Sequence, residues 1–261
     1  MPFTPSHAVA ILPFLRTPLP AAALVVGSMA PDLQYFVPLG LSRSLSHSWP
    51  GILYIDLPIG IVALALWVLV LRAPVLDYAP RWLRERMPSP VRPRNRLVYA
   101  ALVVAALEVG VLTHLVLDFP THAGWLSEQW PWMRDSAGPF TIVRILHFSF
   151  SVIGAAIIAL WVRRWVQRTP RVAAASLVGD RERLAVWGVV GVTLVAVCLA
   201  LAKAGLDAGG RLFDGTLWFY AFCTAVGVAF AFAVVICVVW WVRSRDARRR
   251  VNPSRAAILG E

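Results

Sequence analysis

The sequence predicts an all-α integral membrane protein, a polytopic helical bundle with about five full spans and an N-terminal pair of broken or re-entrant helices. Hydrophobic residues make up 59% of the chain and charged residues only 15%, with a mean hydropathy of +0.68, and a soluble domain is far less apolar. A helix that crosses the hydrocarbon core needs about 20 apolar residues, because backbone polar groups there are satisfied only internally. Five stretches meet that length: 52–71, 97–117, 142–162, 184–202 and 217–242.

Arginine clusters fix the orientation of these spans. Most of the basic residues lie in three segments, 72–96, 163–183 and 243–255, and the positive-inside rule assigns such segments to the cytoplasm. Alternating spans place all three there, and segments 45–51, 119–141 and 203–216, which carry few basic residues, face the other side. We therefore expect a protein of the plasma (inner) membrane with a cytoplasmic C-terminus.

The net charge of +11 fits the same explanation. A charge of this size could indicate nucleic-acid binding, but here it follows from membrane topology and from attraction to anionic lipid. We expect membrane lipid as a partner and no nucleic acid. The three cysteines, Cys198, Cys223 and Cys237, lie within predicted spans without metal-binding spacing.

The domain organisation predicted from this pattern is simple. Residues 1–242 are expected to form a single membrane-embedded helical domain, and residues 243–261 a basic, disordered cytoplasmic tail. The first fifty residues are the least regular part, because the apolar stretch 8–30 is interrupted by Pro13, Arg16, Pro18 and Pro20. Such a segment favours two short helices over one straight span. A signal peptide cleaved after Ala30 is the alternative.

The run from His114 to His122 is the most informative motif. His114 and Asp118 are four residues apart, so a helix places both on one face, where they can bind a single metal ion. On a continuous helix His122 would lie about 12 Å from His114, too far to share the ion. Pro120 disfavours helix at Phe119 and lets the chain turn, so His122 either folds back onto the site or binds a second metal. Imidazole and carboxylate ligands suit zinc first, then manganese or iron.

All five histidines fall at or near the non-cytoplasmic ends of spans, which favours a common site. His47 precedes the first span, His147 lies about two turns inside the third, and His7 is near the N-terminus. The alternative for each is an interfacial histidine bonded to a backbone carbonyl. Asp32, which follows a proline, is equally well explained as a helix cap or turn residue.

Charged residues inside the spans add a second indication. Asp56 and Glu108 are expected to face the bundle interior, since an ionised carboxylate in lipid is costly unless it is paired or hydrated. Arg144 and His147 are three apart and share a helix face. His147 could move protons and Arg144 could hold an anionic substrate group, although an arginine that snorkels to the headgroups explains Arg144 as well.

Four motifs resemble a bacterial inner-membrane family defined as a domain of unknown function: Thr4-Pro5-Ser6-His7, Gly27-Ser28-Met29-Ala30-Pro31-Asp32, His47-Ser48 before Asp56-Leu57-Pro58, and His114-x-x-x-Asp118. That family is similar to membrane-bound metal-dependent hydrolases, and the run ending at His122 resembles the metal-binding helix of zinc-dependent phospholipases C. The resemblance implies a metal site formed by His7, Asp32, His47, His114, Asp118 and His122. Five histidines are too few for the trinuclear phospholipase centre, so it implies one or two metal ions.

Three functions remain open. The first is a metal-dependent hydrolase at the non-cytoplasmic surface, acting on a phosphoester or ester of a small or lipid-linked substrate. The second is a proton-coupled transporter that uses Asp56, Glu108 and the histidines as a relay. The third is a non-catalytic membrane scaffold. A lipid phosphatase of the vanadium-haloperoxidase type fits less well, because Leu107-Glu108 stands where that family has Ser-Arg.

Overall fold

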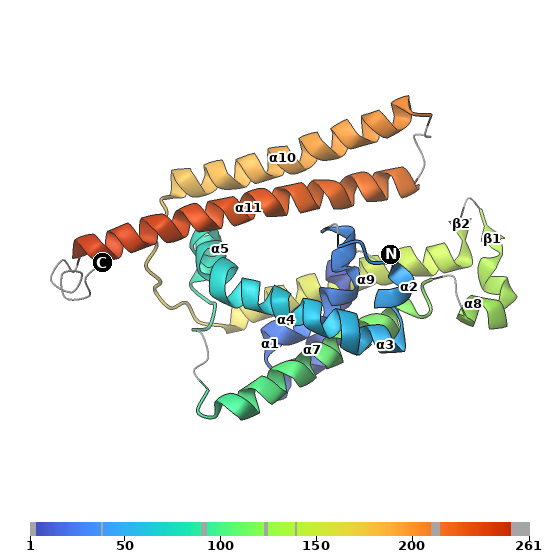
Figure 1. The fold of residues 1–261 in the computed structure, drawn as a ribbon, viewed down its shortest axis with the longest axis horizontal. Helices are drawn as coiled ribbons and strands as arrows, with labels where there is room; N and C mark the ends of the chain where they lie inside the picture. The colour runs from blue at the N-terminus through green and yellow to red at the C-terminus, as the bar shows by residue number, and fades with distance from the viewer. Residues whose placement is uncertain are drawn as a thin grey trace. The chain divides into compact units, whose positions relative to one another are not determined.

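A computed structural model describes residues 4–37, 39–89, 93–122, 125–138, 140–209 and 215–251 (Figure 1). Helices form nearly all the regular structure in these ranges. The exception is a hairpin of two-residue strands, β1 (Ser136–Ala137) and β2 (Phe140–Thr141), which pair antiparallel. The short helices are α2 (Arg43–Ser46), α6 (Arg81–Arg84), α8 (Trp125–Gln129) and the 3-10 helix η5 (Pro131–Arg134).

Within the described ranges, five helices are long and apolar enough to cross a membrane, which confirms the predicted spans. The first, Trp49–Tyr78, is continuous and consists of α3 (Trp49–Gly51), η3 (Ile52–Asp56), α4 (Leu57–Leu66), η4 (Trp67–Leu71) and α5 (Arg72–Tyr78). The others are α7 (Arg96–Asp118), α9 (Ile142–Arg168), α10 (Asp180–Asp207) and the apolar part of α11 (Gly215–Val251).

The first residues of α7 and α9 show why these helices begin where they do. The Asn95 side chain accepts hydrogen bonds from the backbone N–H groups of Leu97 and Val98, at 3.0 and 3.2 Å. Thr141 accepts one from the N–H of Arg144 at 3.4 Å. Each cap binds donors that have no partner within the helix. Asp118 therefore lies at the opposite end of α7 from its capped start.

The N-terminal segment is a broken helical pair, as predicted. The 3-10 helix η1 (Thr4–Arg16) is followed by a break and then by α1 (Ala21–Met29) and the 3-10 helix η2 (Ala30–Tyr35). The Thr4 hydroxyl donates to Asp32 Oδ2 over 2.9 Å, so the beginning and the end of the pair lie together. The segment therefore returns to the level at which it started. We call residues 4–35 the N-terminal hairpin.

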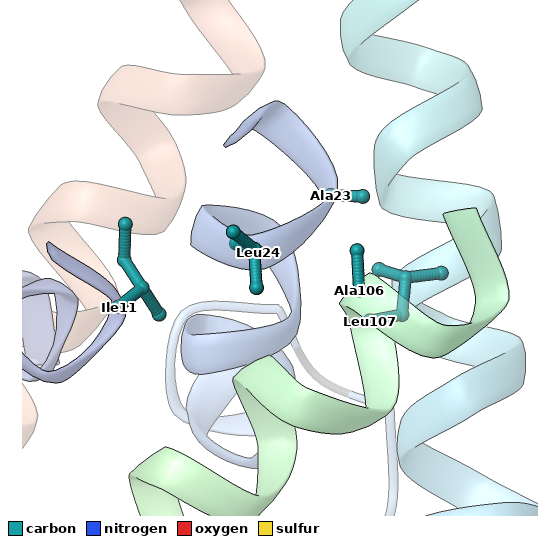
Figure 2. Close-up of a cluster of buried hydrophobic side chains, with 5 residues drawn as sticks. All are labelled: Ile11, Ala23, Leu24, Ala106 and Leu107. Carbon is teal, nitrogen blue, oxygen red and sulfur yellow. The ribbon is translucent and has the colours of Figure 1, made fainter. Parts of the chain in front are cut away.

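The described residues form two compact units, of which the first holds the N-terminal hairpin, α7 and α9. Its central contact is between α1 and α7. Figure 2 shows the buried cluster there: Ile11 from η1, Ala23 and Leu24 from α1, and Ala106 and Leu107 from α7. Burial of these side chains fixes the hairpin against α7.

The second unit holds α5, α6, α10 and α11. In it α10 and α11 run side by side (Figure 1). Asp77 is buried and accepts hydrogen bonds from the N–H of Leu177 at 3.1 Å and from Trp240 Nε1 at 2.7 Å. This carboxylate connects α5, the segment before α10, and α11, and so has a structural role.

A single domain over residues 1–242 stays a prediction. Helix α11 continues to Val251, into the segment for which we predicted a disordered tail. Residues 252–261, the rest of that tail, lie outside the described part of the chain.

Candidate metal centre

Four elements of the first unit meet at the C-terminal end of α7. The last turns of α7 carry His114 and Asp118, η1 carries His7, η2 carries Asp32, and His47 directly follows α2. All except His47 are buried, and the His47 side chain is only 9% exposed. Five of the six residues in the ligand set implied by the resemblance thus lie together.

Two glycines allow the hairpin to reach this end of α7. A Cβ atom on Gly27 would lie 2.2 Å from the carbonyl oxygen of Leu107, and one on Gly110 would lie 2.5 Å from that of Leu24. Only residues without a side chain permit such a backbone contact between α1 and α7. As a result the carbonyl oxygen of Ser28 comes within 2.8 Å of His114 Nδ1.

His114 and His7 each have a backbone carbonyl oxygen as the hydrogen-bond partner of Nδ1. His114 Nδ1 faces the Ser28 carbonyl, and His7 Nδ1 lies 3.3 Å from the Thr4 carbonyl. A carbonyl only accepts, so Nδ1 of each ring carries the hydrogen and the neutral ring presents its lone pair at Nε2. This is the arrangement of metal-binding histidines, whose other nitrogen donates to a carbonyl or carboxylate.

The close packing of these groups is a second feature of the site. His7 Nε2 lies 3.0 Å from Asp118 Oδ1. The rings of His7 and His114 stack with centroids 4.1 Å apart and planes at 16°. Two stacked imidazolium rings would repel each other, so neutral rings around a cation explain the pair better than two protonated ones.

The separations fit ligands of one ion. Bonds of about 2.1 Å place two ligand atoms about 3.0 Å apart at a right angle and about 3.4 Å apart at a tetrahedral angle. Asp118 Oδ2 lies 3.2 Å from His47 Nε2 and 3.6 Å from His114 Nε2. Asp32 Oδ1 lies 3.6 Å from His114 Nε2 and 3.7 Å from His47 Nε2. One of these values falls within that range and the other three exceed it by 0.2–0.3 Å, so a bound ion would draw the ligand atoms slightly closer together.

Two groups of candidate ligands emerge from this geometry, each with its ligand atoms within 4.8 Å of one another: His7, His114 and Asp118, and Asp32, His47 and His114. Both use His114, whose single free lone pair can bind only one ion. The two groups therefore cannot each hold an ion through His114 at the same time, and together they offer five candidate ligands that share this histidine. We call the five residues the metal-ligand cluster.

Several buried polar atoms without a hydrogen-bond partner lie in or near the metal-ligand cluster. Among the described residues, Asp32 Oδ1, His47 Nε2, His114 Nε2 and both carboxylate oxygens of Asp56 are buried without a hydrogen-bond partner. Asp56 interacts electrostatically with His114 and Asp32. The cluster contains two carboxylates, those of Asp32 and Asp118, beside a single guanidinium, that of Arg43, so its ionised carboxylates leave an excess of negative charge that a bound cation would offset. The donor set and its charge thus fit such an ion.

His122 folds back onto Asp118, as the turn at Pro120 allows. Its Nδ1 lies 3.2 Å from the Asp118 carbonyl and 3.5 Å from Asp118 Oδ1, but it belongs to neither ligand group. Burial lowers the pKa of His122 to about 3, which keeps the ring neutral. Its Nε2 is buried without a partner among the described residues. His122 is therefore at the edge of the site.

The two residues predicted to be catalytic lie further out. The ring of His147 is 5.3 Å from that of His122, edge to face, so His147 is next to the site without joining the ligand groups. Arg144 is exposed on α9. No contact between Arg144 and the candidate ligands is found among the described residues, whereas His147 contacts His122 at the edge of the site.

Sequence reasoning missed Arg43 and gave Asp56 only a general role. Arg43 Nη2 donates to Asp118 Oδ2 over 2.8 Å, and its side chain is 33% exposed. Its one signal in the sequence is not local: Arg43 is a basic residue close to segment 45–51, which the predicted topology assigns to the side with few basic residues. Asp56 lies in the π-helical turn η3, a type of irregularity common at functional sites.

The comparisons with known proteins agree with the resemblance seen in the motifs. The domain of unknown function DUF4184 matches residues 1–244, and so covers every residue of the metal-ligand cluster. No match was found among curated proteins or among solved structures. The chain therefore belongs to the DUF4184 family.

Proposed function

We propose that this protein is a membrane-bound metal-dependent hydrolase that acts on a phosphoester or ester at the non-cytoplasmic membrane surface. The observation that carries the proposal is the metal-ligand cluster: five imidazole and carboxylate groups, four of them buried, with ligand atoms within 4.8 Å in each group. A perturbed cluster of titratable groups with convergent lone pairs is the usual mark of a reactive site. Zinc is the first candidate, and a set of five ligands also suits manganese or iron.

The side of the membrane follows from the arginine distribution. The capped start of α7 at Arg96 adjoins an arginine-rich segment, whereas Asp118 ends the same helix. The positive-inside rule assigns the first end to the cytoplasm and the second to the opposite side. This supports an inner-membrane protein with a cytoplasmic C-terminus and a non-cytoplasmic site.

The chain's own residues have distinct tasks in this proposal. A divalent ion held by the cluster would supply an acidified water and polarise the phosphoryl or acyl oxygen of the substrate. Arg43, partly exposed beside Asp118, takes over the role first predicted for Arg144 and stabilises negative charge on the substrate. His147, whose ring lies 5.3 Å from that of neutral His122, carries protons between the site and solvent.

Metal content of detergent-purified protein tests the proposal first. We expect about one equivalent of zinc, manganese or iron by elemental mass spectrometry, and its loss in a His114→Ala/Asp118→Ala double variant. Asp77→Asn is the matched control, since it alters a buried aspartate of the second unit. Metal-loaded protein should then hydrolyse p-nitrophenyl phosphoesters or alkanoate esters and lose this activity with a chelator. Folded protein that binds none of these ions would overturn the proposal.

Asp56 favours a second candidate, a proton-coupled carrier. An unpartnered buried carboxylate within a span is a common proton-binding group in transporters. In that case Asp56→Asn would abolish proton-dependent uptake into vesicles and leave metal content unchanged. If Asp56 instead balances the charge of a bound ion, the same substitution weakens metal binding.

A further inference from the structure

An apolar pocket adjoins the metal-ligand cluster. It has a volume of about 240 Å³ and lies between η1, the end of α7 and α9, all in the first unit. His7 forms one wall, and Leu117, Phe150, Ile153 and Ile157 form much of the rest. Ser6 and His7 are its only polar residues, and the surface that they and the other lining residues present to the pocket is almost entirely apolar.

The direction of the pocket follows from α9. Phe150 and Ile157 are seven residues apart, which is about 10 Å along a helix. Both lie inside the membrane-spanning part of α9, and both remain partly exposed, at 38% and 42%. Gly154, between them, lines the pocket without a side chain. The pocket therefore runs from His7 along α9 at the depth of the lipid chains and is open to them.

We infer that this pocket binds one acyl or alkyl chain of an amphiphilic substrate whose phosphoester or ester group lies at the metal-ligand cluster. The inference rests on the proposed function and names its substrate class. Pockets that enclose a whole small ligand measure about 300–1,000 Å³ and contain several polar groups. This pocket is smaller and apolar, as expected of a site for a chain whose polar group lies elsewhere.

The position of His7 is the second argument. His7 belongs to the cluster and also lines the pocket, so the two sites share a residue. A chain held against Phe150 and Ile153 would end beside the ring of His7, whose Nε2 belongs to the cluster. Hydrolysis adds water across that ester bond and releases the alcohol and the acid.

A chain-length series tests the inference. The probes are p-nitrophenyl alkyl phosphodiesters and p-nitrophenyl alkanoates with two, four, six and eight carbons. Each methylene that enters the pocket should raise kcat/KM about fourfold, equivalent to about 0.8 kcal/mol, until the pocket is full. Ile157→Trp, which fills the pocket, should remove this dependence. Val152→Trp, on an exposed part of α9 that does not line the pocket, should retain it.

A second measurement separates failure of the inference from failure of the proposed function. A diazirine-bearing octanoate at a concentration below that of the protein should label Phe150 or Ile153, with or without metal. Ile157→Trp should lose the label and Val152→Trp should keep it. Hydrolysis without chain-length dependence or pocket labelling would overturn the inference alone. Pocket labelling in a protein that hydrolyses none of the probes would support the chain site and overturn the hydrolase.

Discussion

The substitution Asp32→Asn tests whether Asp32 is a metal ligand or only a structural hydrogen-bonding group. Asp32 is fully buried, and its Oδ2 accepts from Thr4 at 2.9 Å while its Oδ1 has no partner among the described residues. Asparagine has the same shape and can keep the bond from Thr4. It places an NH₂ group where Oδ1 now faces His114 and His47, and an NH₂ group cannot bind a metal ion.

The expected effects have opposite signs with and without metal. Without metal, the substitution removes an unsatisfied buried carboxylate and should raise the free energy of unfolding by about 1–3 kcal/mol. With zinc, it removes one ligand. Four-ligand zinc sites bind with about 10–16 kcal/mol, or about 2.5–4 kcal/mol for each ligand, so zinc affinity should fall about 10²- to 10³-fold.

Thermal unfolding followed by tryptophan fluorescence measures both effects, since the chain has 12 tryptophans. In EDTA the variant should unfold at a higher temperature than wild type, and excess zinc should stabilise wild type more than the variant. Asp77→Asn is the control: Asp77 accepts hydrogen bonds at both carboxylate oxygens, so replacing one oxygen with an NH₂ group should destabilise equally in EDTA and in zinc. If Asp32→Asn behaved in the same way, Asp32 would be a structural group and the assignment as a ligand would be wrong.

Three further predictions test the helix contact, the arginine and the topology. Gly110→Val should shift α1 away from α7, because its Cβ would lie 2.5 Å from the Leu24 carbonyl oxygen. The substitution should lower the free energy of unfolding by about 1–3 kcal/mol and reduce the amount of zinc bound, whereas Gly188→Val, in open space on α10, should change neither. If thermal unfolding and a zinc assay showed equal effects for the two variants, the contact would be refuted. Arg43→Ala, which removes the 2.8 Å bond to Asp118 Oδ2, should slow hydrolysis of anionic phosphodiesters at least tenfold more than that of neutral esters; an equal loss in kcat/KM would make its role structural. A C-terminal green fluorescent protein fusion should fluoresce and an alkaline phosphatase fusion should be inactive, and the reverse result would invert the orientation.

The spans could be predicted because lipid imposes a simple rule on the sequence. Twenty apolar residues between arginine clusters have few alternatives to a helix that crosses the membrane. The prolines after Ile11 predicted the break in the N-terminal hairpin for a similar local reason. Backbone turns that span only a few residues, such as the turn from Asp118 to His122, could also be predicted from the sequence.

The composition of the site could be predicted only in part, because its contacts join distant segments. His7 and Asp118 are separated by 111 positions, and periodicity carries no information at that distance. Nothing local distinguishes Arg43 from a surface arginine, and its role depends on where α2 ends. The same holds for the Ser28 carbonyl, which orients His114 only because Gly27 and Gly110 let two backbones touch.

The N-terminal hairpin also has a consequence for how the protein is made. His7 and Asp32 leave the ribosome first, but their partners on α7 follow about 5–20 s later at ordinary rates of synthesis. During that interval the hairpin has neither the apolar face of α7 to pack against nor His114 and Asp118 beside it. The metal-ligand cluster can therefore be completed only after α7 has been made and has packed against the hairpin, so a metal ion bound there would report that the first unit has assembled correctly.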